Sequence, residues 1–135
     1  IMYVDACALI ALATSEPEAE RVSHALTNAK KRITSAVAIL ETVIALARPD
    51  KFDCTPTQAE AFLMDLLESR NIKLVDLPIA KTASSLSISA FEKFGKGARR
   101  LNLGDCLHYA CAKYYRVPIL ATHDEFRQTD IETIP

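Results

Sequence analysis

Four carboxylates interrupt apolar stretches of this 135-residue chain. They are Asp5 in MYVDACALIALA, Glu41 in AVAILETVIALA, Asp105 in GDCLHYACAKYY and Asp124 in ILATHDEF. A buried charge without a partner costs on the order of several kcal/mol. Taken singly, each acid also has a structural explanation: Asp5 as a helix N-cap, Asp105 at a helix N-terminus, Glu41 reaching water from a helix edge, and Asp124 in a turn.

The four acids together point to a metal site. Carboxylates that gather in one place repel one another, and a cation relieves that repulsion. A ligand set made of oxygen atoms selects hard cations such as Mg²⁺ or Mn²⁺. Such ions polarise a phosphoryl group and activate a bound water. If the acids meet in the fold, the chemistry that they predict is metal-dependent hydrolysis of a phosphodiester bond.

The elements that must position these acids alternate between strand and helix. Apolar β-type segments are expected at residues 3–4, 32–35, 72–77 and 117–122, and helices at residues 6–15, 16–29, 36–47, 57–70, 79–94 and 101–115. This alternation predicts an α/β protein with a mainly parallel sheet. Asp5 and Asp124 then follow two strands directly, where open parallel sheets form their sites.

Local signals set the expected helix boundaries and the buried faces. Ser15 is predicted to cap the second helix, and Thr55 followed by Pro56 to open the fourth. In residues 36–47, a helical period predicts one buried stripe. Its members are Ala36, Leu40, Val43, Ile44 and Ala47. Residues 123–135 are expected to form a loop and tail.

Composition excludes several classes of protein. The formal net charge of −1 provides no global positive field, which argues against a purely electrostatic nucleic-acid binder. The four cysteines form no CxxC pair, so we expect free thiols in a reducing cytosol rather than a zinc site. The apolar run ACALIALA is too short to span a membrane and has no basic segment before it. We therefore expect a cytoplasmic protein.

Four segments together resemble a known family. They are MYVDACALIALA, ITSAVAILETVIAL, ARRLNLGDCLHYACAK and ILATHDEFRQTDI, and they lie in order along essentially the whole chain. In these segments the chain resembles a PIN domain, specifically the VapC toxins of type II toxin–antitoxin modules. The resemblance implies one domain over residues 1–135, a three-layer α/β/α sandwich with a mainly parallel central sheet, and a Mg²⁺- or Mn²⁺-dependent endoribonuclease.

The resemblance also assigns the site. The acidic quartet of the family falls on Asp5, Glu41, Asp105 and Asp124, of which Asp5 and Asp105 are the firmest metal ligands. Small polar residues near the metal fall on Ser35 or Thr34 and on Thr122. Many relatives carry a glycine before the last acid where this chain has His123, so Glu125 stays open as an alternative to Asp124. We expect hydrolysis to leave a 5′-phosphate and a 3′-hydroxyl.

Basic residues precede Asp105, and a histidine follows it. The basic residues, expected to contact the RNA backbone unless they form only a solvated turn, are Lys93, Lys96, Arg99 and Arg100. His108 lies three residues after Asp105, on the same helical face. It is expected to be a packing or surface residue rather than a ligand.

Partners and alternatives complete the expectations. The resemblance implies a homodimer and a VapB-type antitoxin, whose C-terminal segment places a basic residue at the acidic site and whose own domain binds DNA. The alternatives are an inactive PIN-like RNA-binding module, a DNA nuclease of the PIN-like class and a receiver-type signalling domain. A receiver needs paired acids after its first strand, and here Asp5 is single.

Overall fold

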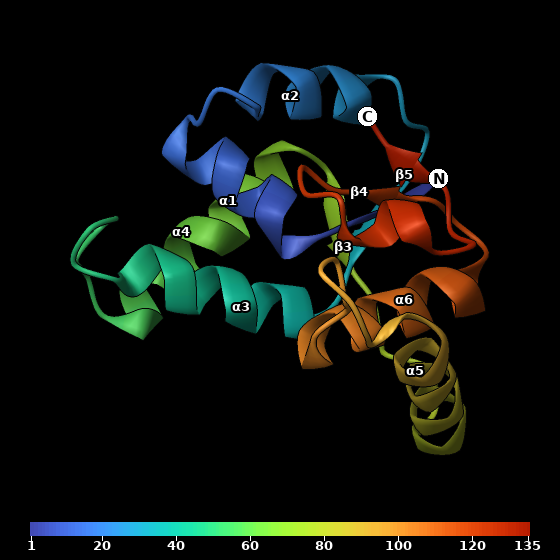
Figure 1. Ribbon diagram of the computed structural model, residues 1–135. Coiled ribbons are helices and arrows are strands. Elements are labelled where there is room, and N and C mark those ends of the chain that lie inside the picture. The colour runs from blue at the N-terminus through green and yellow to red at the C-terminus, as the bar shows by residue number, and fades with distance from the viewer.

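A parallel sheet of five short strands runs through the centre of the protein (Figure 1). The computed structural model describes all of residues 1–135. The strands are β1 (Met2–Val4), β2 (Arg32–Thr34), β3 (Ile72–Leu74), β4 (Ile119–Leu120) and β5 (Thr133–Ile134). They are arranged in the order β3-β2-β1-β4-β5, and every neighbouring pair is parallel. The predicted parallel sheet is confirmed, with β1 at its centre.

Helices cover both faces of this sheet. They are α1 (Ala6–Thr14), α2 (Ala19–Thr27), α3 (Ala36–Ala47), α4 (Pro56–Ser69), α5 (Ala80–Phe94) and α6 (Leu103–Tyr115), with a short 3₁₀ helix η1 (Glu125–Gln128). Side chains alternate along β1 as a strand requires. Met2 and Val4 pack into a core with α1 to α4, and Tyr3 packs into a second core with α5 and α6. The expected three-layer α/β/α sandwich is therefore confirmed.

Three local expectations have different outcomes. The N-cap at Thr55 is confirmed, because its hydroxyl accepts the Gln58 N–H in a capping box. The N-cap at Ser15 is wrong: Ser15 ends α1 in the left-handed region, with φ 54°, and α2 begins only at Ala19, after Pro17. The expected C-terminal tail instead contains η1 and β5, and β5 pairs with β4.

The buried face of α3 also differs from the expectation. Leu40 and Ile44, placed in the predicted buried stripe, are 60% and 59% exposed. The buried residues are Ala38, Ile39, Thr42, Val43 and Leu46. This helix is apolar around nearly its whole circumference, so its period does not indicate which side meets the sheet. Leu40 and Ile44 consequently form an exposed apolar stripe.

Two expected absences concern the cysteines and the membrane. All four cysteines are free, and Cys106 and Cys111 are buried as ordinary core residues. None of the helices has both the length and the apolar character that crossing a membrane requires.

Candidate active site

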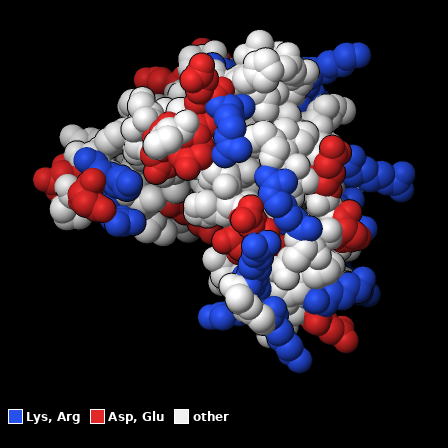
Figure 2. Space-filling view, turned by 45° about the horizontal axis from the view of Figure 1, so that its top comes forward, with Lys and Arg blue, Asp and Glu red and all other residues white.

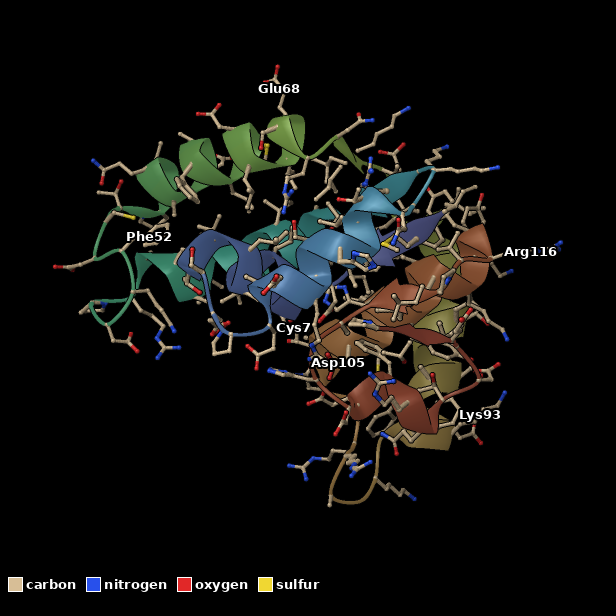
Figure 3. The ribbon with its side chains drawn as sticks, turned by 90° about the horizontal axis from the view of Figure 1, so that it is seen from above. Cys7, Phe52, Glu68, Lys93, Asp105 and Arg116 are labelled. Atoms are coloured by element: carbon tan, nitrogen blue, oxygen red, sulfur yellow. The ribbon has the colours of Figure 1, made fainter.

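Polar side chains gather where the central strands end. Asp5 directly follows β1, Ser35 directly follows β2, and Thr122 lies two residues after β4. From β1 the chain adds β2 and β3 on one side of the sheet and then β4 and β5 on the other. Open α/β sheets form their binding crevices at such a switch point, here between β1 and β4. Helix α6 brings Asp105 to this edge, and Figure 3 shows Asp105 close to Cys7, two residues past Asp5.

Asp5 is a buried carboxylate with one oxygen occupied and one free. It caps α1, which confirms the N-cap role predicted from the sequence. Oδ2 accepts hydrogen bonds from the backbone N–H of Cys7 at 3.3 Å and from the Cys7 thiol at 2.8 Å. Burial and the neighbouring Asp5 charge raise the pKa of Cys7, so the thiol keeps its proton and donates it. Oδ1 has no hydrogen-bond partner, although Asp5 is only 6% exposed. That oxygen therefore accepts no hydrogen bond, and the His108 ring is the charged neighbour beside it.

His108 lies fully buried among the acids. Its Nε2 contacts Glu41 Oε1 and lies 3.3 Å from Asp5 Oδ1. Burial favours the neutral ring, but the hydrogen bond to Glu41 and the charges of Asp5 and Glu41 outweigh burial and raise the pKa of His108. In this arrangement, the ring offsets part of the negative charge of the two carboxylates.

A hydrogen-bonded chain fixes the His108 ring from behind. Nδ1 of His108 lies 2.6 Å from the hydroxyl of Tyr3, which lies 2.7 Å from Ser35 Oγ. Burial raises the pKa of Tyr3 well above its usual value, so its hydroxyl remains protonated. Ser35 thus supports the site through Tyr3. Thr34 instead donates its hydroxyl to the carbonyl of Val4, and the backbone N–H of Thr122 donates to Cys7 Sγ.

Glu41 reaches the cluster from α3 and keeps contact with solvent. Its side chain is 35% exposed. Gly104, at the start of α6, lies against it: a Cβ on Gly104 would collide with the Glu41 carboxylate. The missing side chain of Gly104 therefore allows the first turn of α6 to approach Glu41.

Asp105 sits in the first turn of α6. Its carboxylate accepts the backbone N–H of Asn102 at 3.0 Å, and Asn102 accepts the Asp105 N–H in return, which completes a capping box. Burial, reinforced by the charges of Asp5 and Glu125, raises the pKa of Asp105 to about 6. The repulsion predicted for gathered carboxylates thus contributes to the raised pKa of Asp105, although desolvation contributes more.

The two candidates for the fourth acid occupy different environments. Asp124 is exposed and forms an ion pair with Arg127, at 3.2 Å, at the start of η1. Glu125 is half-buried, and its charge acts on Asp105. Of the two acids, Glu125 is the one whose charge contributes to the raised pKa of Asp105. The role of Asp124 stays a prediction.

The basic residues border this edge of the sheet. The segment between α5 and α6 carries the exposed side chains of Lys96, Arg99 and Arg100, which we call the basic loop. The backbone carbonyl of Arg99 accepts a hydrogen bond from Gln128 of η1, which ties this loop to the segment after β4. Figure 2 shows Lys and Arg side chains around a group of acidic ones in the lower half of that face. Lys93 is exposed at the end of α5.

Sequence reasoning underestimated His108. The side chains whose ligand atoms lie within 4.8 Å of one another are Asp5, Glu41 and His108. Asp105 is not among them, although the charges of Asp5 and His108 act on its pKa. The helical spacing from Asp105 to His108 was the available signal. That spacing did not reveal that the His108 side chain would contact Asp5 at the end of β1.

Fold and site together define a class: a parallel-sheet α/β protein with an acidic, cation-accepting cluster at the carboxyl edge of its sheet. Residues 2–132 match the PIN domain family, to which the chain therefore belongs. It is 34% identical over 135 residues to a ribonuclease VapC of Mycolicibacterium smegmatis, covering 98% of this chain and 99% of that relative.

Solved structures support the same fold. Mycobacterium tuberculosis VapC20, described as a toxin that cleaves the sarcin-ricin loop, superposes with a TM-score of 0.72 at 15% identity, over 100% of both chains. A toxin–antitoxin complex from Klebsiella pneumoniae also gives a TM-score of 0.72, at 13% identity, over 100% of this chain and 97% of the other. At these identities, the likeness concerns the fold.

Proposed function

We propose that this PIN domain, spanning residues 1–135, is a metal-dependent endoribonuclease of the VapC type. The observation that carries the proposal is the buried Asp5 at the end of β1, whose free Oδ1 faces Glu41 and His108. A buried charged oxygen that accepts no hydrogen bond is costly, and the His108 ring 3.3 Å away offsets only part of its charge. Divalent ions accept such oxygens readily, so the residues present fit a metal.

The side chains have separable roles in this proposal. Asp5 and Glu41 would hold a Mg²⁺ or Mn²⁺ ion, with Asp105 beside them and Asp124 or Glu125 completing the negative cluster. When bound, the ion supplies Lewis-acid activation of a water and of the phosphoryl group. The chain itself supplies orientation: Cys7 and the first turn of α1 fix Asp5, and Asn102 fixes Asp105.

The substrate follows from the relatives and from charge. Curated relatives over the full length are named ribonucleases. Because the whole chain carries a net charge of −1, contact with a polyanion depends on a local patch. The basic loop leads directly into α6 and Asp105, which would place a phosphate backbone beside the acids. An RNA substrate also puts the site of action in the cytoplasm.

An antitoxin partner is proposed on the same grounds. The fold is shared with a chain of a toxin–antitoxin complex. A VapB-type antitoxin that inserts a basic side chain between Asp5, Glu41 and Asp105 would occupy the position of the metal and silence the site. DNA contact would then come through the antitoxin.

We also propose a homodimer that buries the stripe formed by Leu40 and Ile44. Two large apolar side chains about 60% exposed, one turn apart on α3, mark a surface that a partner subunit would cover. A Leu40→Asp variant is expected to sediment as a monomer while the wild type sediments as a dimer. An unchanged sedimentation coefficient would place the dimer contact elsewhere.

The direct test of the activity compares matched RNA and DNA oligonucleotides. Purified protein is expected to cleave RNA with Mn²⁺ or Mg²⁺, to stop in chelator, and to spare DNA. Asp5→Asn is expected to lose cleavage and keep its fold, as measured by circular dichroism. Equal cutting of DNA would favour a PIN-like DNA nuclease, and RNA binding without cleavage would favour an inactive module.

A further inference from the structure

An apolar groove lies between α5 and the first turn of α6, two helices that pack along each other (Figure 1). We call it the α5–α6 groove. Its volume of about 460 Å³ falls in the range of small-ligand sites. Three large apolar side chains line it and remain exposed to solvent: Ile88 (64%), Phe91 (60%) and Leu103 (84%). Large apolar side chains that are exposed together indicate a binding surface.

We propose that the α5–α6 groove binds one unstacked nucleobase of the RNA strand, stacked on the ring of Phe91. The inference rests on the proposed ribonuclease function and deepens it. It names the part of the substrate that is held outside the acidic cluster, and a residue that would determine where the strand lies.

The ring of Phe91 is held in place before any ligand arrives. Phe91 lies in the last turn of α5, and Gly95 follows one turn later as its C-cap. A Cβ on Gly95 would collide with the Phe91 ring, so the ring lies directly against the glycine. An exposed aromatic side chain that is already ordered loses little conformational freedom on binding. Such rings are the surfaces on which proteins stack the bases of single-stranded RNA.

The charge around the α5–α6 groove favours a nucleotide as its occupant. Arg100 of the basic loop lines the groove, and Lys96 and Arg99 belong to the same loop. A nucleotide combines an apolar base face with an anionic phosphate, which matches an apolar groove bordered by cations. A second copy of the chain docked symmetrically on this face would instead bring two basic loops together, and like charges oppose that contact.

The first turn of α6 joins the groove to the acidic cluster. Asn102 lines the groove, and its backbone N–H donates to the Asp105 carboxylate. Leu103, on the rim of the groove, is followed directly by Gly104, which lies against Glu41. A base in the groove would therefore hold the strand beside the acids, and a neighbouring phosphodiester bond would meet them.

The test measures binding of a fluorescein-labelled single-stranded RNA, about ten nucleotides long, by anisotropy in chelator so that the strand stays intact. An abasic nucleotide replaces each position in turn. We expect one position at which loss of the base weakens binding roughly tenfold, and Phe91→Ala to lose a similar amount with the intact strand. The two losses are expected not to add when they are combined, because both remove the same stacking contact.

Two further variants separate stacking from a general disturbance of α5. Phe91→Trp keeps a ring in the groove and is expected to retain affinity. Ile79→Ala alters a side chain that is 72% exposed at the opposite end of α5, and is expected to bind as the wild type does. Phe91→Ala should also leave the slope of log affinity against log salt unchanged, because stacking releases no counterions. Circular dichroism checks that each variant is folded.

The possible failures have different consequences. Equal RNA affinity in Phe91→Ala, with no position sensitive to loss of its base, would overturn the base site and leave the ribonuclease standing. Unchanged RNA affinity together with a wild-type dimer that dissociates in Phe91→Ala, as seen by sedimentation, would overturn it in favour of a second copy of the chain. A wild-type protein that neither binds nor cleaves RNA would overturn both proposals.

Discussion

Replacing Asp105 with asparagine tests whether the gathered carboxylates destabilise the metal-free fold. The pKa of Asp105 rises from its usual 3.8 to about 6. In the unfolded chain the group loses its proton near pH 4, and in the folded chain only near pH 6. Between these values, the folded state binds more protons than the unfolded state. Its stability must therefore fall as pH rises through that window, and it stays lower above it.

The size of the effect follows from the pKa shift. About two pH units at 1.36 kcal/mol each give about 3 kcal/mol as an upper bound. Because the carboxylate keeps partial contact with solvent, we take half of that bound, ~1.5 kcal/mol, as the loss in unfolding free energy. The side-chain amide in Asp105→Asn keeps an oxygen that can accept the Asn102 N–H. The variant should consequently be more stable than the wild type at pH 7.5 by about this amount and nearly equal to it below pH 4.

Urea unfolding at a series of pH values measures this difference. Asp130→Asn is a control of opposite sign, because the Lys113 and Tyr109 hydrogen bonds lower the pKa of Asp130. Asp130 contributes stability above the unfolded pKa, so Asp130→Asn is expected to destabilise at pH 7.5, with the loss disappearing as the solution becomes acidic. Adding Mn²⁺ should reduce the advantage of Asp105→Asn. A difference in unfolding free energy between Asp105→Asn and wild type that stays constant from pH 3.5 to pH 7.5 would show that the Asp105 pKa is not raised in the folded protein.

Three further predictions concern the site and its surroundings. Gly104→Ala places a Cβ against the Glu41 carboxylate. We expect this variant to keep its fold and to cleave RNA roughly tenfold more slowly or worse, as when a residue that orients a metal ligand is lost. Full activity would show that Glu41 can move freely. Replacing the basic residues of the basic loop with alanine should weaken RNA binding. The slope of log affinity against log salt should become shallower by about 0.7 for each phosphate that the loop neutralises in the wild type. An unchanged slope would show that the loop is only a solvated turn. Calorimetry should show a larger loss of Mn²⁺ affinity in Glu125→Gln than in Asp124→Asn. The reason is that the Glu125 charge acts on Asp105, whereas Asp124 is paired with Arg127. A larger loss in Asp124→Asn would restore Asp124 as the fourth acid.

The fold was largely predictable because its signals are local. Strand and helix alternate in the sequence, and Thr55 with Pro56 marks a helix start by short-range hydrogen bonds. The failures occurred where tertiary packing decides the outcome. The orientation of α3 is one, because a helix with apolar residues on all sides can present either face to the sheet, and Leu40 and Ile44 were left outside.

The candidate site was predictable in its acids and less so in its geometry. Asp5 stood out as a charge in an apolar run, and its place after β1 followed from the strand pattern. The contact between His108 and Asp5 joins residues far apart in the sequence and depends on how α6 crosses the end of β1. No periodic pattern encodes that crossing. The same holds for the approach of Gly104 to Glu41, which depends on the packing of α6 against α3.

The chemistry of the RNA ends distinguishes metal-dependent hydrolysis from cleavage by the ribose hydroxyl. Hydrolysis by a metal-activated water leaves a 5′-phosphate and a 3′-hydroxyl, whereas attack by the neighbouring 2′-hydroxyl leaves a 5′-hydroxyl and a cyclic phosphate. Cleavage ends are mapped on total RNA incubated with wild-type protein or Asp5→Asn. We predict 5′-phosphate ends that require Mn²⁺ or Mg²⁺ and are absent with Asp5→Asn. Ends with 5′-hydroxyl groups, or cleavage that persists in chelator or in the variant, would contradict it.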